Sequence, residues 1–594
     1  MKRIYLMGSL AMALSLSLFS CSDENSDPSG EDFKPMESDG KYVGEAVGNF
    51  SKEEWYPGGE LGTTDNVASG CYEDEAPAVT AQGLIDDFNA GEKFFERQFT
   101  SANSGFKGLG PASVRRSCLD CHPNYGHGRR MDSYTTSYGN GNGYLLAVYH
   151  PVDGANSNDG GYVAEVTGMP QTQATEPFKA PIDESQIKMQ WHHVTAMESG
   201  LPMKFPDGEA YDLIYPEITI PRSAFRTNPN PYDTGNKAVA VRVESTIGVM
   251  GTGLLDAITE EDLKAQYAST ANYYKNVAAN YYKNVAKVAD VKEYVNPNFW
   301  DASADDFASG AWYAATANAG VYADGGNGKP MVKRFTYALT RASLQDGPGA
   351  NAIWNITNVS RPDRPKLYTT NAWAAAMAED KEVIEKIKND PTSPFWASTD
   401  DEISKRVNGL LKPGTNQFSN EWHNFEPEMS ADHFYEFMVW HRGLAIPRAR
   451  NLNDARVQQG KKVFMEIGCA NCHRPSWKTG SDNYWTPNMI AGKKLPRYAN
   501  QTIYPYSDMM QHKLYMVNDI HGSWCRTTPL WGRGLAAING SGVERLHDCR
   551  ARNEVEAIMW HAYSKNSHAY NSALKFYNLS KADRDAVVMF LRSI

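Results

Sequence analysis

The sequence of 594 residues predicts a mainly α-helical fold of two similar units, with a large insertion of mixed α and β character in the first unit. Three observations lead to this prediction. The pattern Cys-x-x-Cys-His occurs twice, at 118–122 and 469–473. An amphipathic segment that begins with glycine precedes each copy, GEKFFERQF at 91–99 and GKKVF at 460–464. Between the copies lies far more chain than one such unit requires, with strand-like and helical patterns interspersed.

Each pentapeptide has the form of a c-type haem attachment site. Its two thiols bind the vinyl groups of one porphyrin, and the histidine ligates the iron from the proximal side. The attachment residues are Cys118, Cys121 and His122 in the first copy and Cys469, Cys472 and His473 in the second. The alternatives are a zinc half-site or a thioredoxin-like redox pair, but zinc needs four ligands and no other cysteine pair stands at close spacing. The sequence therefore predicts two cytochrome c-like haem domains and two covalently bound c-type haems.

The start of the chain has the pattern of an export signal. A basic start at residues 1–3 is followed by an apolar run at 4–19, and the run ends in Leu-Phe-Ser-Cys at Cys21. This predicts a lipoprotein signal peptide over 1–21 with Cys21 lipidated; the alternative is ordinary cleavage beside a stray cysteine. Residues 22–40 are rich in Ser, Asp, Glu, Pro and Gly, and predict a disordered tether. We expect an exported protein anchored by lipid to the outer membrane, on its periplasmic or cell-surface side.

The rest of the chain divides into two predicted domains. Apolar residues make up 41%, enough for a sizeable core, and the formal charge of −11 argues against nucleic acid as a partner. Residues 41–452 would form the N-terminal haem domain with its insertion, and 453–594 the C-terminal cytochrome c-like domain. The predicted elements are a strand at 239–243, a surface helix over the tandem ANYYKNVA repeat at 271–286, a helix at 371–388 and a terminal helix that starts at Ser580.

Several longer stretches carry a family resemblance. They are GLGPASVRRSCLDCHPNYGHGRR at 108–130, GVMGTGLLDAI at 248–258, KRFTYALTRASLQ at 333–345, IYPYSDMMQHKL at 503–514, RTTPLWGRGL at 526–535 and RLHDCRARNEVEAIMWH at 545–561. In this order the sequence resembles the bacterial di-haem oxidoreductases of the peroxidase type. These are relatives of di-haem cytochrome c peroxidase and of the enzyme that matures methylamine dehydrogenase.

The resemblance implies a chemistry. Electrons would enter at one haem, cross to the other, and reduce peroxide or support oxidation of another substrate. At the first haem, Asp256 in GLLDAI would be the catalytic acid/base, although the family usually has Glu there. At the second haem, relatives use a Met or Tyr as distal ligand, but counting along the family pattern lands on Leu546, which cannot ligate iron. The candidates are therefore Met509, Met510, Met516 and His547.

Other polar residues remain open. His127, Arg129 and Arg130 could contact the haem propionates or form a solvated turn, and His192 or His193 could be a sixth ligand or a structural residue. Cys525 and Cys549 are the closest of the leftover cysteines, and a disulfide between them would leave Cys71 free. The resemblance also leaves open whether a calcium ion binds between the haem domains, as it does in related peroxidases.

Three functions are compatible with these patterns. The first is a di-haem oxidoreductase that turns over peroxide or another oxidisable substrate, with a small redox protein or a quinol-linked donor as electron source. The second is an electron-transfer cytochrome in which both irons are six-coordinate. The third is an accessory lipoprotein of iron acquisition.

Overall fold

The computed structural model describes most of the chain beyond its first 43 residues. The described ranges are 44–100, 110–135, 142–151, 159–227, 240–284, 294–313, 331–345, 352–416, 418–422, 424 and 426–594. The predicted signal peptide and tether lie outside these ranges. Within them, no helix is long and apolar enough to cross a membrane.

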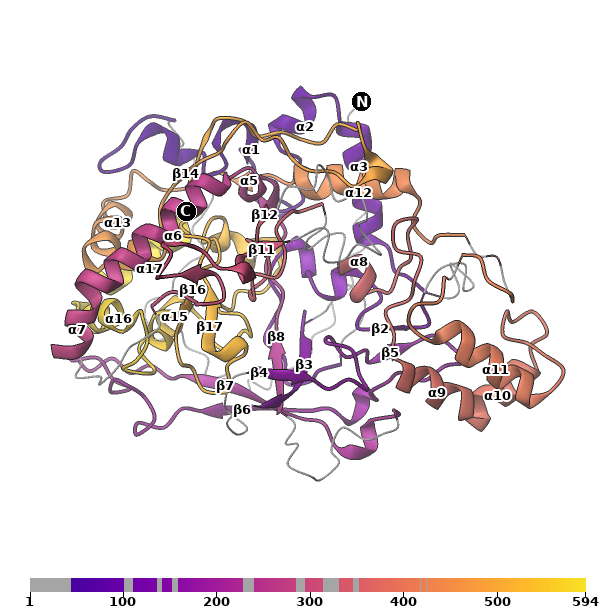
Figure 1. Ribbon diagram of the computed structural model, residues 1–594. Helices are drawn as coiled ribbons and strands as arrows, with labels where there is room; N and C mark the ends of the chain where they lie inside the picture. Colours follow the sequence, from indigo (N-terminus) through magenta and orange to yellow (C-terminus); the bar gives the residue numbers. More distant parts are fainter. Residues whose placement is uncertain are drawn as a thin grey trace, which may run out of the picture.

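Two pairs of crossing helices frame the molecule (Figure 1). In the first pair α3 (Ile85–Glu96) packs on α12 (Ala431–Gly443), and in the second α13 (Ala455–Ile467) packs on α17 (Lys581–Ser593). The members of the first pair are far apart in sequence, because the insertion separates them. The predicted terminal helix is confirmed, with the Ser580 side chain accepting the N–H of Asp583 at its start. The helix predicted at 91–99 is displaced: it begins at Ile85 and ends at Glu96, because Arg97 is extended.

A glycine allows each pair to approach closely. A Cβ on Gly91 would overlap the carbonyl oxygen of Glu436 and lie 2.8 Å from Cβ of Trp440. A Cβ on Gly460 would overlap the carbonyl oxygen of Ala586, again 2.8 Å from an aromatic Cβ, that of Phe590. The glycine that opens each sequence pattern is therefore the point of helix contact.

The insertion contains the larger sheets. Strands β4 (Asp159–Tyr162), β3 (Leu145–Pro151) and β8 (Ala240–Glu244) form an antiparallel sheet in that order, and β6 (Lys188–His193) pairs with β7 (Ile214–Thr219). The strand predicted at 239–243 is β8. The sheet buries a core of its own, which includes Leu146, Val163 and Val243.

A small helical cluster lies at the opposite end of the view from α13 and α17 (Figure 1). It consists of α9 (Asn371–Glu379), α10 (Lys381–Lys388) and α11 (Asp400–Leu411). The prediction of one helix over 371–388 is wrong, because Asp380 is extended and its side chain accepts the N–H groups of Glu382 and Val383, which starts a second helix. The tandem repeat continues α6 (Glu260–Tyr273) through a π-helical turn at Tyr274–Ala278 into α7 (Ala279–Asn284).

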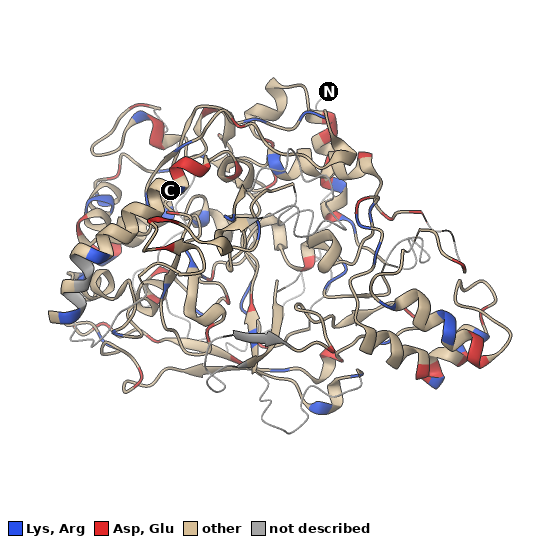
Figure 2. Ribbon diagram, in the orientation of Figure 1, with Lys and Arg blue, Asp and Glu red and all other residues tan. Residues whose placement is uncertain are grey.

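The other elements are short. The helices are α1 (Gly59–Gly62), α2 (Pro77–Ala81), α5 (Thr252–Asp256), α8 (Ala352–Asn355), α14 (Ala536–Asn539), α15 (Glu554–Trp560) and α16 (Tyr570–Tyr577). The paired strands are β1 (Thr63–Thr64) with β13 (Ile446–Pro447), β2 (Ala112–Ser113) with β5 (Gln173–Ala174), β9 (Trp300–Asp301) with β10 (Asp306–Phe307), β11 (Trp312–Tyr313) with β12 (Met331–Val332), β14 (Trp477–Lys478) with β15 (Thr502–Ile503), and β16 (Gln511–Lys513) with β17 (Trp524–Arg526). Acidic and basic residues are interspersed over these elements (Figure 2).

Two apolar clusters surround the two motifs. The first joins α3, α5 and α12 through residues such as Phe95, Leu254 and Trp440, and the second joins α13 and α17 through Phe464 and Phe590. Each cluster thus holds the helix that leads toward one Cys-x-x-Cys-His motif.

Candidate functional site

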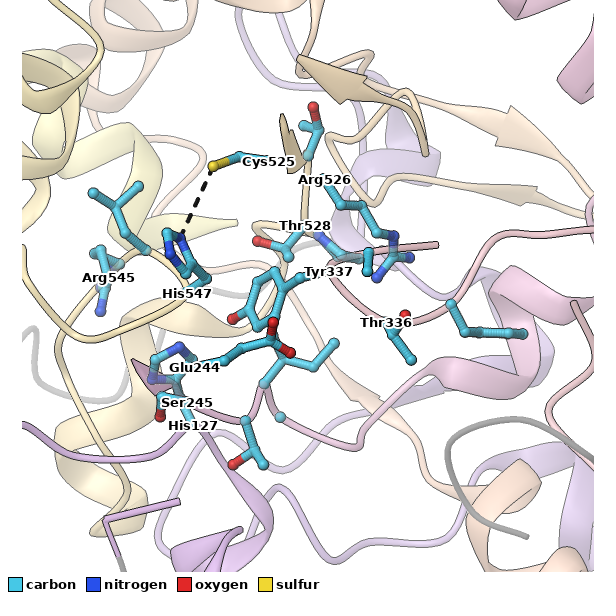
Figure 3. Close-up of a pocket in the computed structure, with 18 of the residues that line it drawn as sticks. His127, Glu244, Ser245, Thr336, Tyr337, Cys525, Arg526, Thr528, Arg545 and His547 are labelled. Atoms are coloured by element: carbon cyan, nitrogen blue, oxygen red, sulfur yellow. Dashed lines mark hydrogen bonds between the residues drawn. The ribbon is translucent and has the colours of Figure 1, made fainter. Parts of the chain in front are cut away.

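Both motifs open onto one cavity of about 730 Å³. The four motif cysteines and both motif histidines are among the side chains that line it. The cavity wall also includes parts of the insertion, such as Glu244 of β8 and Tyr337 (Figure 3). Residues from distant parts of the sequence therefore share a single internal space.

The first motif is a short 3-10 turn that places its histidine inside the molecule. The turn spans Cys118–Asp120, and the N–H of His122 donates to the carbonyl of Cys118 at 2.8 Å. The ring of Phe95 lies 6.1 Å from that of His122. Burial lowers the pKa of His122 to about 4, so its imidazole is neutral at physiological pH. The buried Nδ1 atom of His122 makes no hydrogen bond of good geometry.

The second motif repeats this design and adds an orienting hydrogen bond. Gly468 ends α13 in the left-handed region, with φ of 93°, and leads directly into the turn Cys469–Asn471. The ring of Phe464 lies 6.2 Å from that of His473. The Nδ1 atom of His473 donates to the carbonyl of Tyr506 at 3.1 Å, and burial lowers the pKa of His473 to about 4.

Among the other histidines that line the cavity, one lies near each motif histidine. His441, near the end of α12, is buried and neither of its ring nitrogens has a hydrogen bond. Burial, with a smaller effect of the charge on His122, lowers the pKa of His441 to about 3. His561 follows α15, and its ring centre lies 6.4 Å from that of His473. The sequence analysis missed both; the only signal for His561 is that it ends the family-like stretch at 545–561.

The methionines proposed as distal ligands lie away from this space. Met509, Met510 and Met516 are buried but do not line the cavity, and Met510 packs in a cluster with Tyr267. His547 does line it. As ligands all four stay predictions, and the geometry does not favour the methionines.

His547 is held in a polar group with Cys525 and Asp519. Its Nε2 lies 3.0 Å from an oxygen of Asp519, and its Nδ1 lies 3.9 Å from Sγ of Cys525 (Figure 3). The ring of Tyr337 stands 5.8 Å from that of His547. Both ring nitrogens of His547 therefore face partners within the protein.

Asp256 sits in a buried ion-pair network rather than in the cavity wall. One carboxylate oxygen accepts from Nη1 of Arg442 at 2.6 Å, and the other accepts the N–H of Leu344 at 3.1 Å. Arg442 also pairs with Asp482. Burial raises the pKa of Asp256, and the charge of Arg442 opposes that shift. Its catalytic role stays a prediction.

Two arginines of the stretch at 526–535 line the cavity and each keep a buried donor without a hydrogen bond. The Nε atom of Arg526 and the Nη1 atom of Arg533 are buried without a hydrogen bond, and both residues line the cavity. Burial lowers the pKa of each to about 10. Arg129 instead donates to the carbonyl of Gly540, and Arg130 lies 3.6 Å from Asp132.

The histidines that the sequence left open, His127, His192 and His193, differ in position. His127 lines the cavity, with Nδ1 2.8 Å from the carbonyl of Gly128. His192 and His193 lie on β6 and form surface pairs with Glu217 at 3.0 Å and Asp212 at 2.8 Å. Neither lines the cavity.

The predicted disulfide is wrong in this structure, because Cys525 and Cys549 are both free thiols. Cys525 faces His547, as described above. Cys549 is buried with Sγ 3.5 Å from the carbonyl of Gly128. Cys71 is also free and buried.

Two groups of described side chains have metal-compatible geometry. They are Cys472, Asp508 and His512, and Asp519, Cys525 and His547. Thiol and imidazole donors suit transition metals, whereas calcium prefers oxygen ligands. The first group also shares a motif cysteine. The calcium ion stays a prediction.

Comparison with known proteins now adds to this geometry. Two Cys-x-x-Cys-His motifs that face one cavity are compatible with a protein that holds two haems. Residues 412–594 match the family described as "Di-haem oxidoreductase, putative peroxidase". The match supports the family resemblance for the C-terminal part of the chain, residues 412–594. Neither a curated protein nor a solved structure matches the chain.

Proposed function

We propose that this protein is an exported di-haem c-type oxidoreductase that reduces peroxide with electrons from a small redox protein or a quinol-linked donor. The observation that carries the proposal is the single cavity onto which both motifs open. Two haems attached there would share one internal space, which suits electron transfer between them. The signal pattern and Cys21 support lipid anchorage to the outer membrane.

The residues around the cavity fit haem. Each motif offers two free thiols and a neutral imidazole, the form that ligates iron. The remaining donors of Arg526 and Arg533 suit propionate carboxylates, because no carboxylate hydrogen-bonds either buried guanidinium among the described residues. When bound, haem supplies redox-active iron that exchanges electrons and, at an open position, binds peroxide.

Cleavage of peroxide also needs a group that moves a proton from one oxygen to the other. We assign this role to His441. It lines the cavity near His122, its imidazole is neutral, and both ring nitrogens are free to accept or donate. The carboxylate of Asp256, by contrast, is occupied by Arg442 and Leu344.

The test is haem stoichiometry combined with turnover. Two haems per chain should remain bound after denaturation, as measured by pyridine haemochrome. Replacing Cys118 and Cys121 with Ala, or Cys469 and Cys472 with Ala, should remove one haem each, whereas the matched control Cys525→Ala should keep both. Peroxide should oxidise a reduced donor only in the presence of the di-haem protein.

The outcomes separate the alternatives. One haem or none in the parent protein refutes the proposal. Two low-spin haems without peroxide-dependent turnover would favour the electron-transfer cytochrome. Induction by iron limitation, with co-purification of a transport partner and no turnover, would favour the iron-acquisition lipoprotein.

A further inference from the structure

We infer that His561 is the sixth ligand of the iron at the C-terminal motif, so that this haem is held between two histidines, His473 and His561. The inference rests on the proposed function, since it requires a haem attached to Cys469 and Cys472. It adds a metal ligand that the motif spacing does not indicate.

The separation of the two rings is the first argument. Their centres lie 6.4 Å apart, at an interplanar angle of 51°. Metal–imidazole bonds are about 2.0–2.1 Å long, so two imidazoles that bind opposite sides of one metal ion through Nε2 have ring centres about 6.3 Å apart. His473 and His561 are therefore spaced as two ligands of one iron.

The hydrogen bonds of the two rings are the second argument. The Nδ1 atom of His473 donates to the carbonyl of Tyr506 at 3.1 Å, and that of His561 donates to the carbonyl of Ala557 at 2.7 Å. Metal-ligating histidines commonly donate their other ring N–H to such an acceptor, which fixes the tautomer and the ring orientation. In both residues this leaves Nε2 as the lone-pair nitrogen, and both residues line the cavity.

The third argument is that α15 holds His561 firmly in place. Asn553 caps the helix by accepting the N–H of Glu556 at 2.9 Å. The buried carboxylate of Glu554 lies 2.6 Å from Arg545 and 2.9 Å from Arg592 of α17. These contacts fix the helix against the C-terminal core, and they set the position of the residue that follows it. A positioned ligand loses little freedom on binding a metal.

Other candidates fit less well. The methionines at 509, 510 and 516 do not line the cavity, and the nitrogens of His547 face Asp519 and Cys525. His568 lines the cavity, but its Nδ1 accepts the N–H of Lys513 at 3.2 Å, and its ring contacts are with Tyr274, Tyr294, His512 and Trp524. It therefore serves as a matched control.

The experiment compares the ferric holoproteins of the parent, His561→Ala, His561→Met and His568→Ala by electron paramagnetic resonance and absorption spectroscopy, with haem content measured in each. The parent should show a low-spin signal of a bis-histidine haem and no methionine–iron charge-transfer band. His561→Ala should keep two covalent haems, lose one low-spin haem per chain and regain it when imidazole is added. His561→Met should gain the methionine band, and His568→Ala should match the parent.

Two results would overturn the inference while leaving the proposed function intact. One is an unchanged low-spin signal in His561→Ala at full haem content. The other is loss of that signal in His568→Ala alone. Absence of covalent haem at Cys469 and Cys472 in the parent would instead refute the proposed function, so the two failures are distinguishable.

Discussion

The two motif regions share a design but hold their histidines differently. In both, a helix crosses a partner at a glycine and sets a phenylalanine about the same distance from the motif histidine, 6.1 Å for Phe95 and 6.2 Å for Phe464. At the C-terminal motif, His473 and the histidine near it each donate Nδ1 to a backbone carbonyl. At the N-terminal motif, Nδ1 of His122 makes no hydrogen bond of good geometry, and neither ring nitrogen of His441 has a hydrogen-bond partner.

This difference suggests that the two motif regions have different roles. Hydrogen bonds to Nδ1 fix an imidazole for permanent ligation, which suits a site that only passes electrons. A buried, neutral imidazole whose two nitrogens have no partner, as in His441, can accept and donate a proton, which suits a site that reacts with peroxide. On the proposed function, we therefore assign the reaction with peroxide to the N-terminal motif and the entry of electrons to the C-terminal motif.

The largest expected effect is at His441. If its imidazole moves the proton, His441→Ala should lower peroxide turnover by about 10²- to 10⁴-fold, while haem content and the C-terminal low-spin signal stay unchanged. The control is His433→Ala, on the same helix at its exposed end. Steady-state oxidation of a reduced donor measures the rate. Full turnover in His441→Ala would show that His441 does not transfer the proton.

The second prediction concerns Asp256, whose carboxylate accepts a hydrogen bond from Arg442, the residue that follows His441. Asp256→Asn leaves a buried guanidinium with one carboxylate partner fewer, so the free energy of unfolding should fall by about 3 kcal/mol. Denaturant unfolding measures it, and Asp432→Asn, an exposed acid of α12, is the control. If turnover instead falls by about 10²-fold or more at unchanged stability, the catalytic role predicted from the sequence stands.

The third prediction tests whether the two helix crossings are equivalent. Gly→Ala inside a helix ordinarily stabilises by up to about 1 kcal/mol. At Gly91 and Gly460 the added methyl group meets backbone of the partner helix, so each substitution should destabilise by about 1–3 kcal/mol. Thermal unfolding of both variants measures it, with exposed Lys462→Ala as control. If alanine stabilised the protein at only one of the two glycines, the two helix crossings would not be equally close.

These comparisons show which features the sequence could predict. Local patterns sufficed for the motifs and the cap at Ser580, because each depends on neighbours within one turn. They also indicated a helix before each motif, but they misplaced its start, because Gly91 and Gly460 lie inside α3 and α13. They did not reveal the pairing of α3 with α12, since the insertion separates the two helices. His441 and His561 were missed for the same reason: a histidine becomes a candidate ligand only when distant chain brings it near a motif. Asp380 was missed because its side chain can cap a helix within an otherwise continuous helical pattern.

The smallest expected effect is a pH dependence confined to the N-terminal unit. In each unit a tyrosine packs on the phenylalanine that lies near the motif histidine. The ring centres are 4.9 Å apart for Tyr125 and Phe95, and 6.1 Å apart for Tyr506 and Phe464. The hydroxyl of Tyr125 lies 3.0 Å from Glu92 and 3.1 Å from Glu96. The hydroxyl of Tyr506, by contrast, faces Glu54, and this carboxylate forms an ion pair with Lys461 at 2.7 Å. Burial, with a smaller effect of the charge on Glu96, raises the pKa of Glu92 from 4.5 to about 7.

The sign of the effect follows from this raised pKa. Between pH 4.5 and about 7 the folded protein binds more protons at Glu92 than the unfolded chain does, so the contribution of Glu92 to stability is full below pH 4.5 and is lost as pH rises through 7. Glu92→Gln should remove this part of the pH dependence and make the protein more stable than the parent at pH above 7. Glu54→Gln, the C-terminal counterpart, should instead destabilise at neutral pH, because it leaves Lys461 without its carboxylate. Urea unfolding across this pH range measures both, and equal pH profiles for the parent and Glu92→Gln would contradict the contrast between the two units.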